Sequence, residues 1–261
     1  MAVNNQLTLL LVTYHDDFDM LDGLFTSIVN YSLNEYKLLI VLNDSTDYLN
    51  ELKSIINEFQ IDYEIVEKFS ELEHTPVFHS NFGVRQTDIG WITQQMITLL
   101  AAKIIKTPYY LHVCSKDIFA KPFKLSDIIS TNKVKVQQEE WYFIRPDVDN
   151  LFNNYFKNVC KLFKLDQSLA RDKMIKCMTP VVNNTEYINR MLDDIRAMGL
   201  ELADIIGIDK SSSNTQNKTN EYYLYCAWLA KNNLTDQVLE FYKSSASPYN
   251  MREKTYDLRR K

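Results

Sequence analysis

The N-terminal part of the chain alternates between continuous apolar runs and segments in which apolar positions recur with helical spacing. The apolar runs cover residues 7–14, 36–42 and 61–69, and continuous runs of this kind are typical of parallel strands that are covered on both faces. Between them, residues 19–31 and 48–59 place apolar side chains at intervals of three and four, the spacing of amphipathic helices. This order predicts a parallel sheet with crossover helices, and hence an α/β core.

The rest of the chain is expected to be richer in helices. Its pattern predicts helices over residues 91–105, 151–163, 185–198 and 221–231, strands over 109–113, 140–144 and 179–182, and a short last element over 234–242. Thr185 is expected to cap one of these helices, and Asn220 or Thr219 another. Residues 74–90 and the low-complexity stretch 210–220 are expected to be loops.

No internal repeat or linker divides the sequence, so we expect a single domain over residues 1–261. Within it we separate a half over residues 1–131, a half over 132–243 and a polar tail over 244–261. The N-terminus lacks a basic segment, and its apolar run over residues 7–13 is too short for a signal peptide. No segment approaches the roughly 18 apolar residues of a membrane span, so we expect neither a leader nor a transmembrane segment.

Composition and charge narrow the classes of function. The net charge is −5, which gives no electrostatic reason to expect a nucleic-acid partner, because proteins that bind nucleic acid usually carry a basic footprint. The four cysteines form no C-x-x-C pair and lie at positions 114, 160, 177 and 226, which argues against a zinc ribbon or a thioredoxin motif. They are best interpreted as buried thiols in a reducing compartment, and we expect a cytoplasmic protein.

The expected binding edge of the sheet lacks glycine-rich phosphate motifs. In parallel sheets ligands gather beyond the carboxyl ends of the strands, which here carry residues 13–16 and 43–45. No G-x-G-x-x-G follows the first strand and no Gly-Lys-Ser/Thr occurs, so the dinucleotide fingerprint and the P-loop are absent. A sugar-phosphate nucleotidyltransferase, which usually opens with a glycine-rich loop, is disfavoured as well. Asp44 could accept hydrogen bonds from a nucleoside, or it could cap the next helix.

The turn after the fourth predicted strand carries polar residues that suit a diphosphate. Ser115, Lys116 and Asp117 follow that strand directly. Hard cations such as Mg²⁺ and Mn²⁺ prefer oxygen ligands, which Ser115 and Asp117 offer, and Lys116 could counter phosphate charge. The alternative is a solvated turn in which Asp117 hydrogen-bonds the local backbone.

Several short motifs occur in an order that resembles a known class of proteins. They are Val12-Thr13-Tyr14, Asn43-Asp44-Ser45, Gly90-Trp91-Ile92-Thr93-Gln94-Gln95, residues 109–117, Thr179-Pro180 and Glu221-Tyr222-Tyr223-Leu224-Tyr225. Over residues 7–230, approximately, the chain resembles the GT-A glycosyltransferases, and in particular a poorly characterised bacterial and viral glycosyltransferase-like family. The resemblance implies a GT-A-like, Rossmann-type sheet, mixed but mainly parallel and flanked by helices, with a helical C-terminal part.

The resemblance also implies an activity. That activity is the transfer of a sugar from a nucleotide diphosphate sugar to a hydroxyl of a glycan or a related acceptor. Residues 1–131 would then hold the nucleotide sugar, and residues 132–243 would shape the acceptor side. The alternative is a catalytically inactive protein of the same fold that binds a nucleotide sugar or a glycan.

The turn departs from the metal-binding motif of such enzymes, which is Asp-x-Asp. Depending on the alignment, the two positions hold Cys114 and Lys116, or Ser115 and Asp117. One carboxylate is missing in either case, and a single carboxylate with a hydroxyl binds Mn²⁺ or Mg²⁺ more weakly. Lys116 could supply part of the positive charge instead, so a requirement for Mn²⁺ or Mg²⁺ stays open.

The other implied site residues come from the strand ends and from the Gly-Trp helix. The implied nucleotide-sugar ligands are Thr13, Tyr14, His15, Asp44, Arg85, Asp88, Trp91, Gln94, Gln95, Ser115 and Lys116, with Asp117 as the metal ligand. Gln94 and Gln95 could bind sugar hydroxyls and Trp91 could stack on a sugar ring, or Trp91 could anchor the core. His112, inside a strand, is expected to be an ordinary core residue.

Glu221 is the implied catalytic residue. An inverting sugar transfer needs a base that takes the proton of the acceptor hydroxyl, and Glu221 begins the helix that carries the Glu-Tyr-x-x-Tyr motif. A carboxylate at a helix start is also favoured for purely structural reasons, because the helix dipole stabilises its charge. That effect predicts a lowered pKa for Glu221, which would weaken it as a base.

Overall fold

A five-stranded sheet with the strand order β3-β2-β1-β4-β8 forms the centre of the molecule. The computed structural model describes residues 4–31, 36–67, 86–122, 124–139, 151–177, 179–207, 218–242 and 251–253. The strands are β1 (Asn4–Thr13), β2 (Tyr36–Leu42), β3 (Tyr63–Glu67), β4 (Tyr109–Val113) and β8 (Val181–Asn184). The first four run parallel and β8 is antiparallel to β4. This arrangement confirms the mixed, mainly parallel α/β fold.

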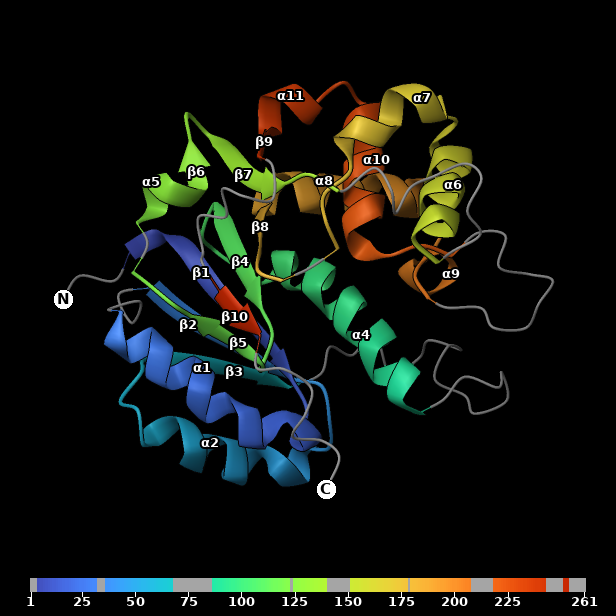
Figure 1. Ribbon diagram of the computed structural model, residues 1–261. Helices are drawn as coiled ribbons and strands as arrows, with labels where there is room; N and C mark the ends of the chain where they lie inside the picture. The colour runs from blue at the N-terminus through green and yellow to red at the C-terminus, as the bar shows by residue number, and fades with distance from the viewer. Residues whose placement is uncertain are drawn as a thin grey trace.

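Helices cover both faces of this sheet (Figure 1). α1 (Phe18–Asn30) and α2 (Leu49–Asn57) lie together on one face, whereas α4 (Gln86–Leu100) lies on the other. α1 and α2 make the crossovers from β1 to β2 and from β2 to β3. The next connection returns past β1 to reach β4, so its helix must lie on the opposite face, because crossovers between parallel strands are right-handed.

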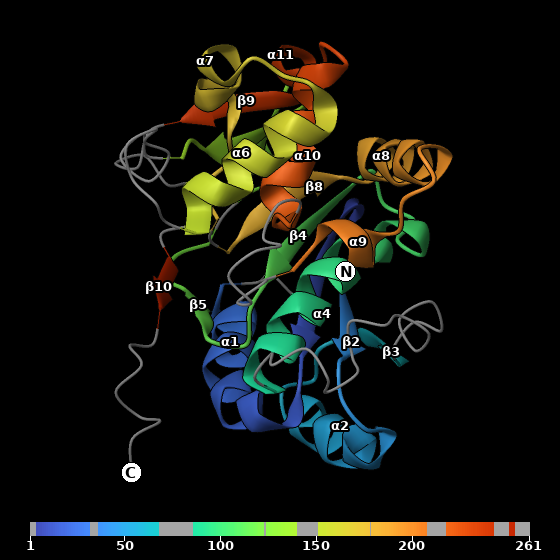
Figure 2. The same cartoon turned by 90° about the vertical axis from the view of Figure 1, so that its right-hand side faces the viewer.

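The C-terminal part is mainly helical and stands at one end of the sheet (Figure 2). Its longer helices are α6 (Leu151–Phe163), α8 (Thr185–Ala197) and α10 (Glu221–Lys231), and its short ones are α7 (Gln167–Ala170), α9 (Leu202–Ile205) and α11 (Thr235–Val238). Residues 221–229 of α10 are all buried. A helix with no exposed face is packed against neighbours on all sides, so α10 lies at the centre of this part. Among the described residues, no helix combines the length and apolar character that a membrane crossing requires.

Two smaller pairings extend the fold beyond the predicted sheet. A three-stranded sheet has the order β6-β7-β9, and β5 pairs with β10 antiparallel. The strands are β5 (Asp117–Phe119), β6 (Ile129–Ser130), β7 (Lys133–Gln137), β9 (Leu239–Tyr242) and β10 (Met251–Glu253), with the short helix α5 (Leu125–Ile128) before β6. The last predicted element, residues 234–242, thus divides into α11 and β9, and residues 251–253 of the predicted tail form a strand.

Some predicted bounds differ from the observed ones. α4 begins at Gln86 instead of near Gly90, and a 3₁₀ turn over Ala101–Lys103 follows it. The predicted strand over 140–144 lies outside the described residues, as does most of the loop over 210–220. The predicted loop over 74–90 is described only where α4 has already begun.

The two predicted helix caps have different outcomes. Asn184, not Thr185, caps α8, because Oδ1 of Asn184 accepts from the N–H of Tyr187 at 3.2 Å. Asn220 caps α10 as predicted, and its Oδ1 accepts from the N–H of Tyr223 at 2.8 Å. This cap fixes where α10 starts, and so fixes the position of Glu221, the first residue of the helix.

Candidate active site at the carboxyl edge of the sheet

Three loops meet at the carboxyl ends of β1, β2 and β4. The N–H of Asn43 donates to the carbonyl of Thr13 at 2.8 Å, and the N–H of His15 donates to Oδ2 of Asp44 at 3.0 Å. The hydroxyls of Thr13 and Ser115 are hydrogen-bonded at 3.0 Å. These contacts bring the three loops to one edge, as a parallel topology favours.

Asp44 ties two of these loops together. Its carboxylate oxygens accept from the backbone N–H groups of His15 and Ser45, the second at 2.7 Å. The hydroxyl of Ser45 accepts from the N–H of Asp47, so Ser45 holds the cap position of the following 3₁₀ turn, Thr46–Tyr48. The interpretation of Asp44 as a helix cap is therefore wrong, and its half-buried carboxylate lies between the loops after β1 and β2.

An aromatic pair borders this edge. The ring of His15 stacks on Tyr48 with centroids 4.0 Å apart and planes inclined by 19°, and it meets Phe18 edge-on at 5.5 Å. Nε2 of His15 lies 3.7 Å from the carboxylate of Glu51, and Tyr14 beside it is half-buried. Tyr48 was missed at the level of sequence, because an aromatic residue at a helix start is usually a packing residue.

α4 approaches the same edge from the other face of the sheet. Nδ2 of Asn43 donates to the carbonyl of Gly90 at 3.2 Å, and Nε2 of Gln94 donates to Sγ of Cys114 at 3.5 Å. The helix therefore contacts the loops after both β2 and β4. Trp91 is 40% exposed, so its interpretation as a core anchor is wrong.

The other predicted ligands on and before α4 are Arg85, Asp88 and Gln95. Arg85 lies outside the described residues, and Asp88 belongs to α4 with a side chain that is not described, so their roles stay predictions. Gln95 is buried and joins α4 to α10, since its Oε1 accepts from the N–H of Glu221 at 3.4 Å. Within the described part of the chain, Nε2 of Gln95 is buried without a hydrogen-bond partner.

Asp117 closes the turn after β4. Its Oδ2 accepts from the N–H of Cys114 at 2.7 Å, and its own N–H donates to the Cys114 carbonyl at 3.0 Å. The residue is 1% exposed, and these are the local bonds that its structural interpretation predicts. Burial and Asp117 raise the pKa of the Cys114 thiol to about 12, against opposing effects that include a hydrogen bond from Thr179 and the charge of Lys116.

The residues around Asp117 do not form a set of metal ligands. Across the described segments, no three His, Cys, Asp or Glu side chains are grouped so that they could hold a metal ion. One oxygen of Asp117 is used inside its turn, and the hydroxyl of Ser115 is bonded to that of Thr13. Divalent cations of this kind need several oxygen ligands, so the described side chains do not by themselves complete a site for Mn²⁺ or Mg²⁺.

Glu221 is a buried carboxyl at the start of α10, where it is 5% exposed. Burial raises its pKa from 4.5 to about 8, against smaller opposing effects of its backbone N–H and of the Tyr222 side chain. The expected lowering of this pKa is therefore wrong. Burial can raise a carboxyl pKa by about 3–5 units, whereas a helix dipole contributes about 0.3–1 kcal/mol, less than one unit.

Tyr222 connects Glu221 with the turn after β4. Burial raises the pKa of Tyr222 well above its ordinary value, and the charges of Glu221, Cys114, Cys177 and Asp117 raise it further. The hydroxyl of Tyr222 lies 3.3 Å from Nδ1 of His112 on β4. Tyr222 therefore links the start of α10 to the strand that leads into this turn.

Glu139 is a second buried carboxyl against α10. Its Oε2 accepts from the hydroxyl of Tyr223 at 2.9 Å and from the N–H of Cys177 at 3.3 Å. Nδ2 of Asn220 donates to the sulfur of Cys177 at 3.1 Å. Glu139 was missed at the level of sequence, because a single glutamate after a short strand belongs to no motif.

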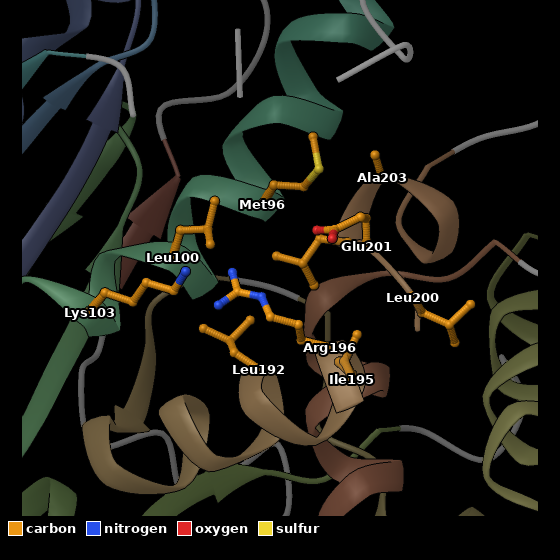
Figure 3. A pocket seen from close by; sticks show the side chains of 10 residues that line it. Met96, Leu100, Lys103, Leu192, Ile195, Arg196, Leu200, Glu201 and Ala203 are labelled. Carbon is orange, nitrogen blue, oxygen red and sulfur yellow. The ribbon is translucent and has the colours of Figure 1, made fainter. Parts of the chain in front are cut away.

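A pocket lies between α4, α8 and α9 (Figure 3), and none of the predicted site residues lines it. Met96 and Leu192 form part of its apolar wall. The charged ends of Lys103 and Arg196 point toward one another inside it, with Glu201 nearby. The pocket is therefore separate from the edge of the sheet where the strand ends meet.

The fold is that of glycosyltransferases of known structure. Core-mannan synthase A from Aspergillus fumigatus, in its Mn/GDP form, is 8% identical over 92% of this chain and 73% of its own, with a TM-score of 0.57. Mouse xyloside xylosyltransferase 1, in its apo form, is 6% identical over 91% of this chain and 85% of its own, with a TM-score of 0.46. At such identities the likeness extends to the fold alone.

The chain belongs to a protein family of unknown function, DUF6492, whose family model matches residues 5–254. No curated protein sequence matches the chain. The likeness to core-mannan synthase A therefore shows the fold, and the chemistry has to be argued from the geometry of this chain.

Proposed function

We propose that this protein transfers a sugar from a nucleotide diphosphate sugar to a hydroxyl of a glycan or a related acceptor. One observation carries the proposal. In a glycosyltransferase fold, the loops after β1, β2 and β4 and the start of α10 come together, and each contributes a polar or ionisable side chain. Ligands of open α/β sheets bind at this edge.

In this proposal the nucleotide is held on the side of Asp44. Two backbone N–H groups orient its carboxylate, and its remaining lone pairs can accept from ribose hydroxyls. The stacked pair of His15 and Tyr48 borders the nucleoside. Lys116 counters the charge of the diphosphate, and the exposed indole of Trp91 offers a face for a sugar ring.

Glu221 acts as the base of the transfer. The acceptor oxygen forms a bond to the anomeric carbon, the bond from that carbon to the diphosphate breaks, and the hydroxyl proton goes to Glu221. A general base works best when its pKa is near the operating pH, and burial brings the pKa of Glu221 to about 8. The diphosphate leaves with its charge countered by Lys116.

A protein that binds a nucleotide sugar without turning it over is the second candidate. The position of Asp117 favours it, because this carboxylate is buried and closes its own turn. A cation that would assist departure of a diphosphate has no described ligand set there.

The test is release of nucleoside diphosphate from UDP- and GDP-sugars, with and without added Mn²⁺. We expect slow release by the wild-type protein, and binding without release by Glu221→Gln. Binding without release by the wild type would favour the second candidate. A wild type that binds no nucleotide sugar would contradict both.

A further inference from the structure

The pocket between α4, α8 and α9 shares no residue with the proposed site and combines an apolar wall with charged groups (Figure 3). Seven of its ten lining residues are apolar, and the other three are Lys103, Arg196 and Glu201. Its volume is about 70 Å³, roughly half of the ~150 Å³ of an apolar cavity that holds a benzene ring. The pocket therefore suits a short chain or a small group.

Helical spacing places each cation beside the apolar wall. Met96, Leu100 and Lys103 follow one another at intervals of four and three along α4 and the 3₁₀ turn after it, so their side chains share one face. Leu192 and Arg196 are four residues apart on α8 and share a face as well. In both helices the charged end extends from the apolar face into the pocket (Figure 3).

The turn after α8 supplies the third wall. Gly199 has a φ of +73°, the left-handed conformation in which many helices end. Its N–H donates to the carbonyl of Arg196 at 2.9 Å, and the N–H of Leu200 donates to the carbonyl of Ile195 at 3.3 Å. These bonds satisfy carbonyl groups at the end of α8, and the chain turns so that residues 200–203 line the pocket.

Lys103 and Arg196 converge on the pocket without a counter-ion in contact. Each lies in the last turn of its helix, where the helix dipole favours a cation. That preference explains a cation at each position, but it does not require both charged ends to point into one pocket, where like charges repel. Among the described residues, neither side chain makes a hydrogen bond or an ion pair.

We propose that this pocket binds a small amphipathic acid, in which a carboxylate or phosphate group is attached to a short apolar chain. The acid group lies between Lys103 and Arg196, because ammonium and guanidinium groups donate charge-assisted hydrogen bonds to such oxygens. The chain lies against Met96, Leu100 and Leu192, which removes apolar surface from water. An anion without the chain, or a chain without the charge, satisfies only one part of the pocket. The inference does not rest on the proposed function.

Glu201 limits the affinity of the pocket for an acid. Its carboxylate lies near the two cations (Figure 3), so it offsets part of their charge and repels an incoming acid group. Its N–H donates to Oδ2 of Asp204 at 3.0 Å, which anchors its backbone at the start of α9. Removing the charge of Glu201 should therefore strengthen binding, the opposite of the effect of removing either cation.

The ligand class can be tested by titration of the full chain with butyrate and with butyl phosphate. Acetate, inorganic phosphate and butylamine are the controls. The protein has eight methionines, so ¹³C-labelled methionine methyl groups report binding, with the signal of Met96 assigned by Met96→Leu. We expect at least one of the two acids to shift the Met96 signal, with an affinity tenfold or more above that of acetate and inorganic phosphate.

The controls define what would overturn the inference. Butyrate binding alone or butyl phosphate binding alone would support it and identify the acid group. Absence of binding by both, or equal binding by butylamine, would overturn it. Inorganic phosphate that binds as tightly as butyl phosphate, or acetate that binds as tightly as butyrate, would show an adventitious anion only, with no role for the apolar wall.

Variants of the charged residues locate the site. Lys103→Gln and Arg196→Gln should each weaken binding about tenfold, and both side chains are exposed, so the variants should fold. Glu201→Gln should strengthen binding severalfold. Lys106→Gln and Arg190→Gln are the matched controls, because both residues are exposed and lie outside the pocket. They should bind as the wild type does, and equal losses in all four cation variants would contradict a site in this pocket.

Nucleotides separate this pocket from the edge where the strand ends meet. We expect UDP and GDP not to displace the bound acid, because no predicted nucleotide ligand lines the pocket. Competitive displacement would place the two ligands in one site and contradict the inference. Binding of the acid by a protein that binds no nucleotide would support the pocket and leave the proposed function contradicted.

Discussion

Glu221 occupies a helix start, where sequence context favours a charged carboxylate, and yet burial raises its pKa to about 8. Burial shifts the pKa of His112 in the opposite direction and lowers it to about 4, because burial disfavours the charged form of both groups. The residues that enclose both come from β4, α4 and α10, which are far apart in the sequence. A sequence pattern identifies Glu221 as a candidate, but it does not show that these elements bury the side chain. It therefore predicts the wrong direction for the shift of its pKa.

The buried carboxyl of Glu221 should make the stability of the protein depend on pH. Its folded pKa of about 8 lies above its unfolded value, so the folded state binds more protons between these values. The free energy of unfolding should therefore fall as pH rises from about 5 to 8, by up to ~4 kcal/mol at about 1.4 kcal/mol per unit. Urea denaturation at several pH values measures this.

The control for that experiment is Glu221→Gln, which keeps the shape and cannot ionise. Its stability should vary less between pH 5 and pH 8 than that of the wild type. Parallel pH profiles for the two proteins would show that Glu221 is ionised in the folded state at neutral pH.

Asp117 allows a second prediction at the residue scale. Asp117→Ala leaves the N–H of Cys114 without its 2.7 Å acceptor, and a buried unpaired donor costs about 1–3 kcal/mol. Asp117→Asn keeps an oxygen acceptor and should lose less stability. Denaturation midpoints of the two variants compare them. If the wild type and both variants were equally stable, and both variants lost a Mn²⁺-dependent activity, the result would instead support Asp117 as a metal ligand.

The secondary structure elements show where local pattern suffices. β2 (Tyr36–Leu42), α6 (Leu151–Phe163) and α10 (Glu221–Lys231) have the predicted bounds, because continuous apolar runs and helical spacing are local signals. β5 and β10 were missed, since each has three residues and exists only through pairing with the other. β7 was missed as well, although its alternation of charged and apolar residues is a local signal; its partner β9 lies about a hundred residues further along the chain.

The cap of α10 links an element to the site and gives a third prediction. Asn220→Ala removes the acceptor of the Tyr223 N–H and the donor to Cys177, and should cost about 1–2 kcal/mol of stability. It should also lower transfer activity, because Glu221 is the first residue of this helix. Asn184→Ala removes the cap of α8 and is the matched control. It should lose similar stability and keep activity, and equal activity losses would contradict the special role of the α10 cap.

At the scale of the whole molecule, topology decides which predicted residues can act together. Parallel strands put the loops after β1, β2 and β4 on one edge, so the convergence of Thr13, Asp44 and Ser115 follows from the sequence pattern. The approach of α10 to the same edge does not, because it depends on how the C-terminal helices pack. For that reason Glu139 and the contacts of Glu221 had no signal in the sequence.

The most direct test of the account is calorimetric titration of the protein with UDP and with GDP. We predict binding of at least one of them, weakened by about tenfold or more, about 1.4 kcal/mol, in Asp44→Ala, which loses the carboxylate between the loops after β1 and β2. Asp47→Ala removes a nearby exposed carboxylate and should bind as the wild type does. Absence of binding by the wild type, or equal binding by Asp44→Ala, would contradict a nucleotide site at this edge.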